Sequence, residues 1–156
     1  MLVSILDCNL NFCYCSTTVP PLTSEDVYGK PPWHFAPVEQ QDAIKTRLAR
    51  CLALGESQRY WTDSLIHGTT ITWYVRADRI PSGVICIGFM LPPTAKTLTA
   101  ENIEFLRQLA AGASLKQIAA NLGIDPSSAT RRRRAIERKL QISDAATLLK
   151  LAIAMS

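Results

Sequence analysis

The sequence predicts an α+β protein in which an antiparallel sheet with helices is followed by an all-α domain of four helices. Residues 1–91 contain mostly short, partly alternating apolar runs, which are typical of strands, whereas 94–156 carry apolar residues at helical spacing. The charge divides in the same way: seven Lys and Arg stand against eight Asp and Glu in 1–93, and ten against five in 94–156. Because Pro92 and Pro93 would stop either kind of element, we expect two domains, 1–91 and 94–156.

Length and composition limit the class of protein. A chain of 156 residues, 47% apolar and 19% charged, can form one ordinary or two small domains and is too apolar to be disordered. No window approaches the ~20 uninterrupted apolar residues of a membrane-spanning helix. Residues 1–6 are apolar but lack a basic lead-in and end at Asp7, so no secretory signal is expected. We therefore expect a cytoplasmic protein with no membrane partner.

The five cysteines predict reduced thiols rather than disulfides or a metal site. An odd number cannot all pair within the chain, and a chain of this length does not need such staples. No Cys-x-x-Cys occurs, and neither histidine lies near the cluster of Cys8, Cys13 and Cys15. Since a zinc or iron–sulfur site needs about four convergent ligands, we expect no metal site and instead buried, apolar cysteines, including Cys51 and Cys86.

The first domain is expected to begin with a hairpin of strands 2–6 and 10–16, which the Pro20-Pro21 pair would end. The elements that follow are a short helix over 24–30, a long helix over 38–54, and strands over 58–66, 69–80 and 84–91. His67-Gly68 and Pro81-Ser82-Gly83 form the turns between those strands. The long helix should face the core with the apolar residues at helical spacing: Ala43, Ile44, Leu48, Cys51 and Leu52.

The second domain is expected to contain helices over 98–111, 115–122, about 126–140 and 143–155. Gly112 and Gly123 supply a stop and a tight turn. The helices begin at side chains that cap well: Thr99, Ser114, one of Asp125, Ser127 or Ser128, and Ser143 or Asp144.

The third helix of this domain has two different faces. On a helical wheel, its apolar side is formed by Ala129, Ile136 and Leu140, and its opposite side by Thr130, Arg131, Arg134 and Arg138, with Arg132 and Lys139 on one flank. Two short helices joined by a tight turn, the second cationic on one face, suit the DNA major groove, which is ~12 Å wide and admits one helix. Arginines can contact guanine edges or phosphates there, and small Ser127 and Ser128 would let the helix start approach the backbone. The alternative is a solvated basic face with no partner.

Residues 98–152 resemble the LuxR/FixJ-type helix-turn-helix output domain of bacterial transcription regulators. The resemblance rests on LTAEN at 98–102, LAAGASLKQIAANL at 109–122 and, without a gap, SATRRRRAIERKL at 128–140. It implies phosphate contacts by Lys116, Ser128 and Lys139 and base-facing positions at Thr130, Arg131 and Arg134. The family's histidine, valine and lysine are replaced here by Arg132, Ala129 and Thr130, which leaves the sequence preference open. The last helix resembles one that pairs such domains into dimers, although a plain packing helix is the alternative.

The first domain resembles the PAS sensory family. The order of strands and helices carries this resemblance, together with LDCNLNFCY at 6–14, VYGKPPWHFAP at 27–37 and Trp73. Such a domain implies a ligand between sheet and helices, or a role in dimer contact only. No cofactor is predicted, because the flavin motif Asn-Cys-Arg-Phe-Leu-Gln is absent and 38–54 holds no haem-binding histidine. His34 is expected to be structural, and the tryptophans to be core or interface residues. A small-molecule ligand remains possible.

These observations favour a bacterial transcription regulator that binds double-stranded DNA as a homodimer under the control of a PAS-like sensor. The predicted DNA-binding residues are Lys116, Ser127, Ser128, Thr130, Arg131, Arg132, Arg134, Arg138 and Lys139. RNA polymerase or an upstream signalling protein is a possible further partner. No phosphate loop, nucleophile elbow or metal motif occurs, so no enzyme is expected. The alternatives are an interaction module whose basic helix binds an acidic protein or RNA, and a cofactor-bearing redox sensor.

Overall fold

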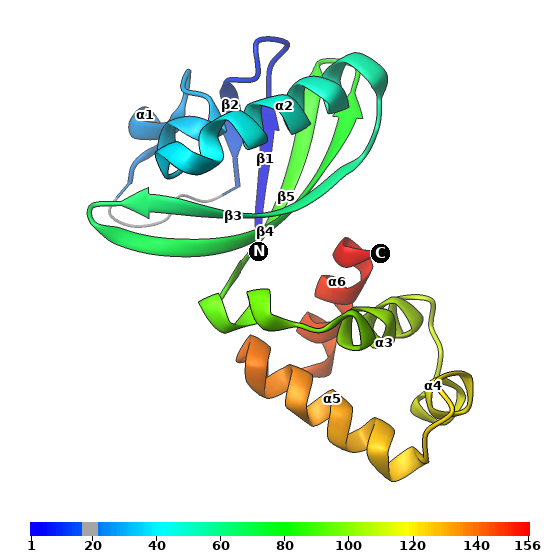
Figure 1. Ribbon diagram of the computed structural model, residues 1–156. Coiled ribbons are helices and arrows are strands. Elements are labelled where there is room, and N and C mark those ends of the chain that lie inside the picture. Colours follow the sequence, from blue (N-terminus) through cyan, green and yellow to red (C-terminus); the bar gives the residue numbers. More distant parts are fainter. Residues whose placement is uncertain (17–21) are drawn as a thin grey trace. The chain divides into compact units, whose positions relative to one another are not determined.

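The computed structural model describes residues 1–16 and 22–156, and contacts divide the chain into two compact units, Met1–Met90 and Leu91–Ser156 (Figure 1). The predicted break at Pro20-Pro21 lies outside the described residues. No helix among the described residues is both long and apolar enough to cross a membrane.

The first unit is built on a five-stranded sheet in the order β2-β1-β5-β4-β3. Its strands are β1 (Leu2–Leu6), β2 (Phe12–Cys15), β3 (Gln58–Ile66), β4 (Thr69–Ile80) and β5 (Gly83–Leu91). Strand β1 pairs antiparallel with both neighbours, so that Ser4 lies opposite Cys15 on one side and Cys86 on the other. On the other half of the sheet, Thr62 of β3 lies opposite Trp73 of β4. Because opposed residues point to the same face, this register decides which side chains meet the helices.

Three helical segments cover one face of this sheet: α1 (Ser24–Val27), the 3-10 helix η1 (Pro32–Phe35) and α2 (Val38–Leu54) (Figure 1). Helix α2 buries Ile44, Leu48 and Cys51, which are spaced by four and three residues and therefore share one face. It ends at Gly55, whose φ of 71° suits a residue without a side chain. The predicted inner position Ala43 is wrong, because that residue is exposed.

The predicted hairpin and cysteines differ from the structure in two respects. Strand β2 starts only at Phe12, because the Asp7 carboxylate accepts the N–H groups of Asn9 (2.8 Å) and Asn11 (2.9 Å) and closes a longer turn. Cys8 in this turn and Cys13 on the edge strand are exposed, and Cys15 is half-buried, so the expectation of buried cysteines is wrong for these three. It is confirmed for Cys51 and Cys86, which lie in the core.

The second unit contains the 3-10 helix η2 (Pro93–Thr97) and four α-helices: α3 (Ala100–Ala110), α4 (Leu115–Asn121), α5 (Pro126–Leu140) and α6 (Ala145–Met155). Each α-helix begins at a side chain that accepts a backbone N–H, and these are Thr99, Ser114, Asp125 and Asp144. Helix α3 packs on α6, and α4 packs on α5. The fully buried centre is formed by Phe105, Leu106, Ile118, Ile136, Leu140, Leu148 and Leu151.

Candidate functional site: a basic helix face and a cavity

Helix α5 is fixed at its start by a tight turn and a strong cap. Gly123, with φ 64°, reverses the chain after α4, and the N–H of Ile124 returns to the carbonyl of Ala119 at 3.0 Å. The Asp125 carboxylate then accepts the backbone N–H of Ser128 at 2.9 Å and both serine hydroxyls of the first turn. These hydrogen bonds satisfy N–H groups at the start of α5 and fix the residue at which the helix begins.

The outward side of α5 is a stripe of cationic side chains. Arg131, Arg134 and Arg138 are exposed and are spaced by three and four residues, so they project from one face. A surface groove runs beside them and is closed at the helix end by residues 141–143. Within the described part of the chain, none of these three guanidinium groups makes an ion pair. We call these three residues the arginine stripe.

The two arginines between Arg131 and Arg134 each pair with a carboxylate of the same unit. Arg132 Nη2 lies 2.8 Å from Glu101 Oε2 on α3, and Arg133 Nε lies 2.8 Å from Glu137 Oε1 one turn along α5. Their side chains are only 25% and 30% exposed. The helix therefore uses part of its charge to hold α3 and itself in place, and leaves the charge of the arginine stripe open to a polyanion.

The remaining predicted DNA-binding residues lie around this stripe in different states. Lys116 on α4 and Ser127 are exposed. The hydroxyl of Ser128 donates to Asp125, and that of Thr130 donates to the carbonyl of Pro126 at 3.0 Å. Lys139 Nζ donates to the carbonyl of Thr97 in η2 at 3.1 Å. The roles of these residues at DNA remain predictions.

The cap of α5 predicts a dependence of stability on acid. The hydroxyls of Ser127 and Ser128 lower the pKa of Asp125, with a further contribution from the Ser128 backbone N–H. A lowered folded pKa gives stability that is present above the unfolded value of ~3.9 and is lost as the pH falls through the folded value. The melting temperature of the protein should therefore fall below about pH 4. The D125S variant keeps a capping oxygen but no titrating group, so its melting temperature, followed by circular dichroism, should fall less steeply; an unchanged slope would contradict this.

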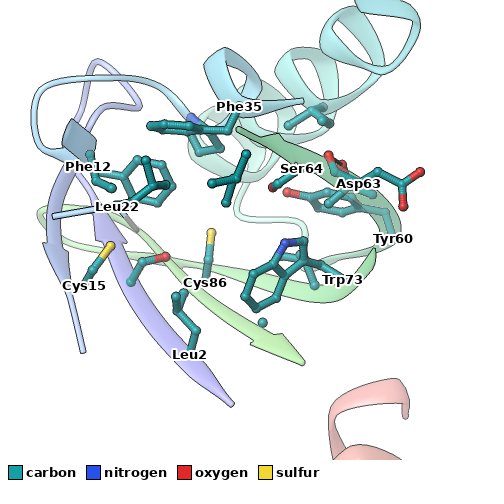
Figure 2. A pocket seen from close by; sticks show the side chains of 18 residues that line it. Leu2, Phe12, Cys15, Leu22, Phe35, Tyr60, Asp63, Ser64, Trp73 and Cys86 are labelled. Atoms are coloured by element: carbon teal, nitrogen blue, oxygen red, sulfur yellow. Dashed lines mark hydrogen bonds between the residues drawn. The ribbon is translucent and has the colours of Figure 1, made fainter. Parts of the chain in front are cut away.

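A partly open cavity of about 120 Å³ lies in the first unit, between the sheet and the helical segments (Figure 2). Alternate residues of β3 point into it, namely Tyr60, Thr62, Ser64 and Ile66. Aromatic and apolar side chains from the neighbouring strands and the helical segments complete the lining, among them Leu2, Phe12, Leu22, Val27, Phe35, Ile44, Trp73 and Val75. The cavity is therefore a largely apolar site of the size that holds a small molecule.

A hydrogen-bonded group borders this cavity. Gln40 of α2 donates to Asp63 Oδ2 at 2.9 Å and accepts both the Asp63 backbone N–H (2.9 Å) and the Thr62 hydroxyl (3.1 Å). Thr72 of β4 donates to Asp63 Oδ1 at 2.8 Å. These bonds tie α2 to the middle of β3 and β4 and hold the side chains of Thr62 and Asp63 in fixed positions.

Burial keeps three titratable side chains of the cavity lining uncharged, those of Cys86, Cys15 and Tyr60. Desolvation raises the pKa of the Cys86 thiol to about 12 and, with a contribution from Cys13, that of Cys15 to about 11. Desolvation also raises the pKa of the Tyr60 phenol well above its usual value. Such thiols are poor nucleophiles at neutral pH. His34, which is expected to be structural, is exposed on η1 and meets the Phe35 ring edge-on, with 5.1 Å between the ring centroids.

The sequence pointed to the arginines but not to the cavity-lining residues. A signal was available in 58–66, where Tyr60, Thr62, Ser64 and Ile66 alternate along the strand and would share the face that meets the helices. Among the described residues, no group of three His, Cys, Asp or Glu side chains is placed to hold a metal ion.

Comparisons with known proteins identify the fold. No sequence model of a known family matches the chain, and no curated protein matches it in sequence. The structure of a Rhodobacter sphaeroides LOV protein is similar over 96% of this chain and 87% of its own, at 12% identity and a TM-score of 0.51. A Vibrio cholerae VqmA dimer without target DNA is similar over 99% and 82%, at 18% identity and 0.48. VqmA bound to DPO is similar over 97% and 80%, at 19% identity and 0.47.

The likeness to the LOV protein extends to the fold and no further, because the identity is so low. It confirms the predicted α+β, PAS-like fold. That the second unit is a LuxR-type helix-turn-helix domain remains a prediction.

Proposed function

We propose that this chain is a transcription regulator that binds duplex DNA by placing α5 in the major groove. The arginine stripe carries this proposal: three exposed cations on one helix face, without a carboxylate partner among the described residues, beside two neighbours that are internally paired. A structural role would favour pairing all five, as Arg132 and Arg133 are paired. Helix α4 packs on α5 and the turn between them at Gly123 is short, which suits a helix pair that docks against a groove.

Control of this activity is assigned to the first unit. Its cavity would bind a small molecule, and the liganded form would favour one arrangement of the output units over another. Assembly as a homodimer is assigned to α6, on which Leu149 (39% exposed) and Ile153 (49% exposed) lie four residues apart on one face. The chemistry of both sites is binding rather than catalysis, so the protein is proposed not to be an enzyme.

Salt dependence of DNA binding tests the proposal. If each protomer of a dimer neutralises three phosphates, the affinity for a random duplex should fall about 10³-fold between about 50 and 200 mM salt, because bound counterions are released. An electrophoretic mobility shift over that range measures it. Absence of binding at the lowest salt would overturn the proposal. Tighter binding of a single-stranded RNA than of a duplex with the same sequence would overturn it in favour of an RNA-binding basic helix.

A further inference from the structure

The first turn of α5 holds a chain of hydrogen bonds whose direction is fixed by the chemistry of its two ends. The Ser128 hydroxyl lies between Asp125 Oδ2 and the guanidinium of Arg131, whose Nη2 is 2.9 Å from Ser128 Oγ. A guanidinium only donates hydrogen bonds, and an ionised carboxylate only accepts them. Asp125 is ionised at neutral pH, because the serine hydroxyls hold its pKa below the usual value. Ser128 must therefore donate its proton to Asp125 and accept from Arg131.

This direction leaves the Ser128 hydroxyl without a proton for DNA. A serine hydroxyl carries a single hydrogen, and a phosphate oxygen in DNA only accepts hydrogen bonds. The backbone N–H of Ser128 is also in use, since it donates to Asp125 Oδ1 at 2.9 Å. The negative charge of Asp125 would in addition repel a phosphate at this place. The phosphate contact that the family resemblance implies for Ser128 would therefore require a bond to Asp125 to break.

The same hydrogen bond gives the Arg131 guanidinium a fixed direction. Arg131 follows Ser128 by one turn, and helical side chains lean toward the start of their helix, so the guanidinium lies over the first turn of α5. Among the side chains at described positions, none accepts a hydrogen bond from the Arg134 guanidinium. The first residues of a recognition helix reach base edges, and a bidentate contact needs the guanidinium plane in one orientation. Arg131 is thus prepared for such a contact, whereas Arg134 must still be ordered.

We infer that Ser128 is a positioning residue for DNA binding, which together with Asp125 holds the Arg131 guanidinium ready for the duplex and makes no phosphate contact of its own. This role rests on the proposed function of α5. A long side chain that is ordered before binding loses less conformational entropy when the complex forms. The S128A variant should therefore bind a duplex about fivefold more weakly, and the whole loss should pass through Arg131.

A double-mutant cycle separates positioning from direct contact. The full chain is compared as wild type, S128A, R131A and S128A/R131A in mobility shifts at one low salt concentration. We expect S128A to cost about fivefold when Arg131 is present and less than about twofold in the R131A background. A phosphate contact made by Ser128 itself would be lost to the same extent in both backgrounds. S128T restores the hydroxyl and should bind within about twofold of the wild type.

Ser127 provides the matched control for the cycle. Its hydroxyl also donates to Asp125, at Oδ1, whereas Arg131 donates to Ser128. Any loss of affinity caused by S127A should therefore be the same with and without Arg131. S128A is expected to fold, because alanine favours a helix and Asp125 still accepts the backbone N–H of residue 128, and circular dichroism checks this.

The order of the Arg131 side chain is measured without DNA, by ¹⁵N relaxation of the arginine Nε–Hε groups. The R131A and R134A variants identify the two signals. We expect the Nε–Hε group of Arg131 to be more ordered than that of Arg134 in the wild type and in S127A. In S128A, the order of Arg131 should fall to the level of Arg134, because the acceptor is gone.

Two results would overturn the positioning role and leave the proposed function intact: an equal loss from S128A in both backgrounds of a protein that binds duplex, or an Arg131 side chain no more ordered than Arg134. A coupled loss for S127A would also overturn it, since the effect would then belong to the Asp125 cap as a whole. Absence of duplex binding by the wild type would instead reject the proposed function, and the positioning role with it.

Discussion

Replacing Arg131 and Arg134 together by alanine is expected to weaken binding to a duplex by about 100-fold at low salt. Both side chains are exposed, and neither holds a carboxylate among the described residues, so their removal leaves no buried charge behind. The substitution of Arg131 removes one hydrogen bond on the helix surface, which its guanidinium donates to Ser128 Oγ at 2.9 Å. The effect should therefore fall on binding rather than on folding.

The measurement is a mobility shift as a function of salt, with thermal unfolding as the check on folding. Each lost phosphate contact should reduce the slope of log affinity against log salt by about one. The double variant R107A/K150A is the matched control: it removes two cations from exposed positions of the same unit, on α3 and α6, outside the stripe. If R107A/K150A weakens duplex binding as much as R131A/R134A does, only net charge matters, and insertion of α5 into the groove is contradicted.

The helices of the second unit were predictable because their signals are local. Thr99, Ser114 and Asp144 were named as capping side chains, and each accepts a backbone N–H three residues ahead. Among the three candidates for α5, the structure selects Asp125, and the two serines donate to it. A cap needs only a side chain and the next turn of its own helix, so a sequence window of a few residues contains all of the information.

The pairing of the arginines could not be predicted in the same way. Arg133 and Glu137 are one turn apart, but Arg132 meets Glu101 from a different helix, 31 positions earlier. The arrangement that brings α3 beside α5 depends on packing of the whole unit. The helical wheel puts Arg132 and Lys139 on the same flank of the helix. In the structure both side chains hold neighbouring segments, because Arg132 pairs with Glu101 of α3 and Lys139 donates to the Thr97 carbonyl of η2.

The cavity shows the same division between local and long-range information. Strand limits such as Gln58–Ile66 and Thr69–Ile80 follow from alternation and turns, and the structure confirms them. Which residues face a cavity rather than a filled core depends on the volumes of side chains from all five strands and from α1, η1 and α2 together. Gly88 on β5 leaves room for Trp73 on β4, and no pattern within either strand indicates that. The exposure of Cys13 likewise depends on β2 lying at the sheet edge.

The substitution with the largest expected effect on folding is G83A. Gly83 has φ 146°, a region that residues with a side chain rarely adopt, and a Cβ placed there would lie 1.9 Å from the carbonyl oxygen of Leu6. This oxygen belongs to β1, which pairs with β5 from Leu6 and Val84 onward. An alanine must push the two central strands apart, so we expect the first unit to lose about 3 kcal/mol or more of unfolding free energy.

Urea unfolding measures this loss, with tryptophan fluorescence as the signal, since all three tryptophans lie in the first unit. G68A is the matched control: Gly68 also has a positive φ, 79°, but nothing lies within 4 Å of the added carbon, so the backbone preference alone should cost about 1 kcal/mol. If G83A costs no more than G68A, then the close approach to Leu6 does not limit the strand pairing. Helix α5 folds in the other unit, so circular dichroism of G83A should retain a helical transition after the fluorescence transition has moved to lower urea.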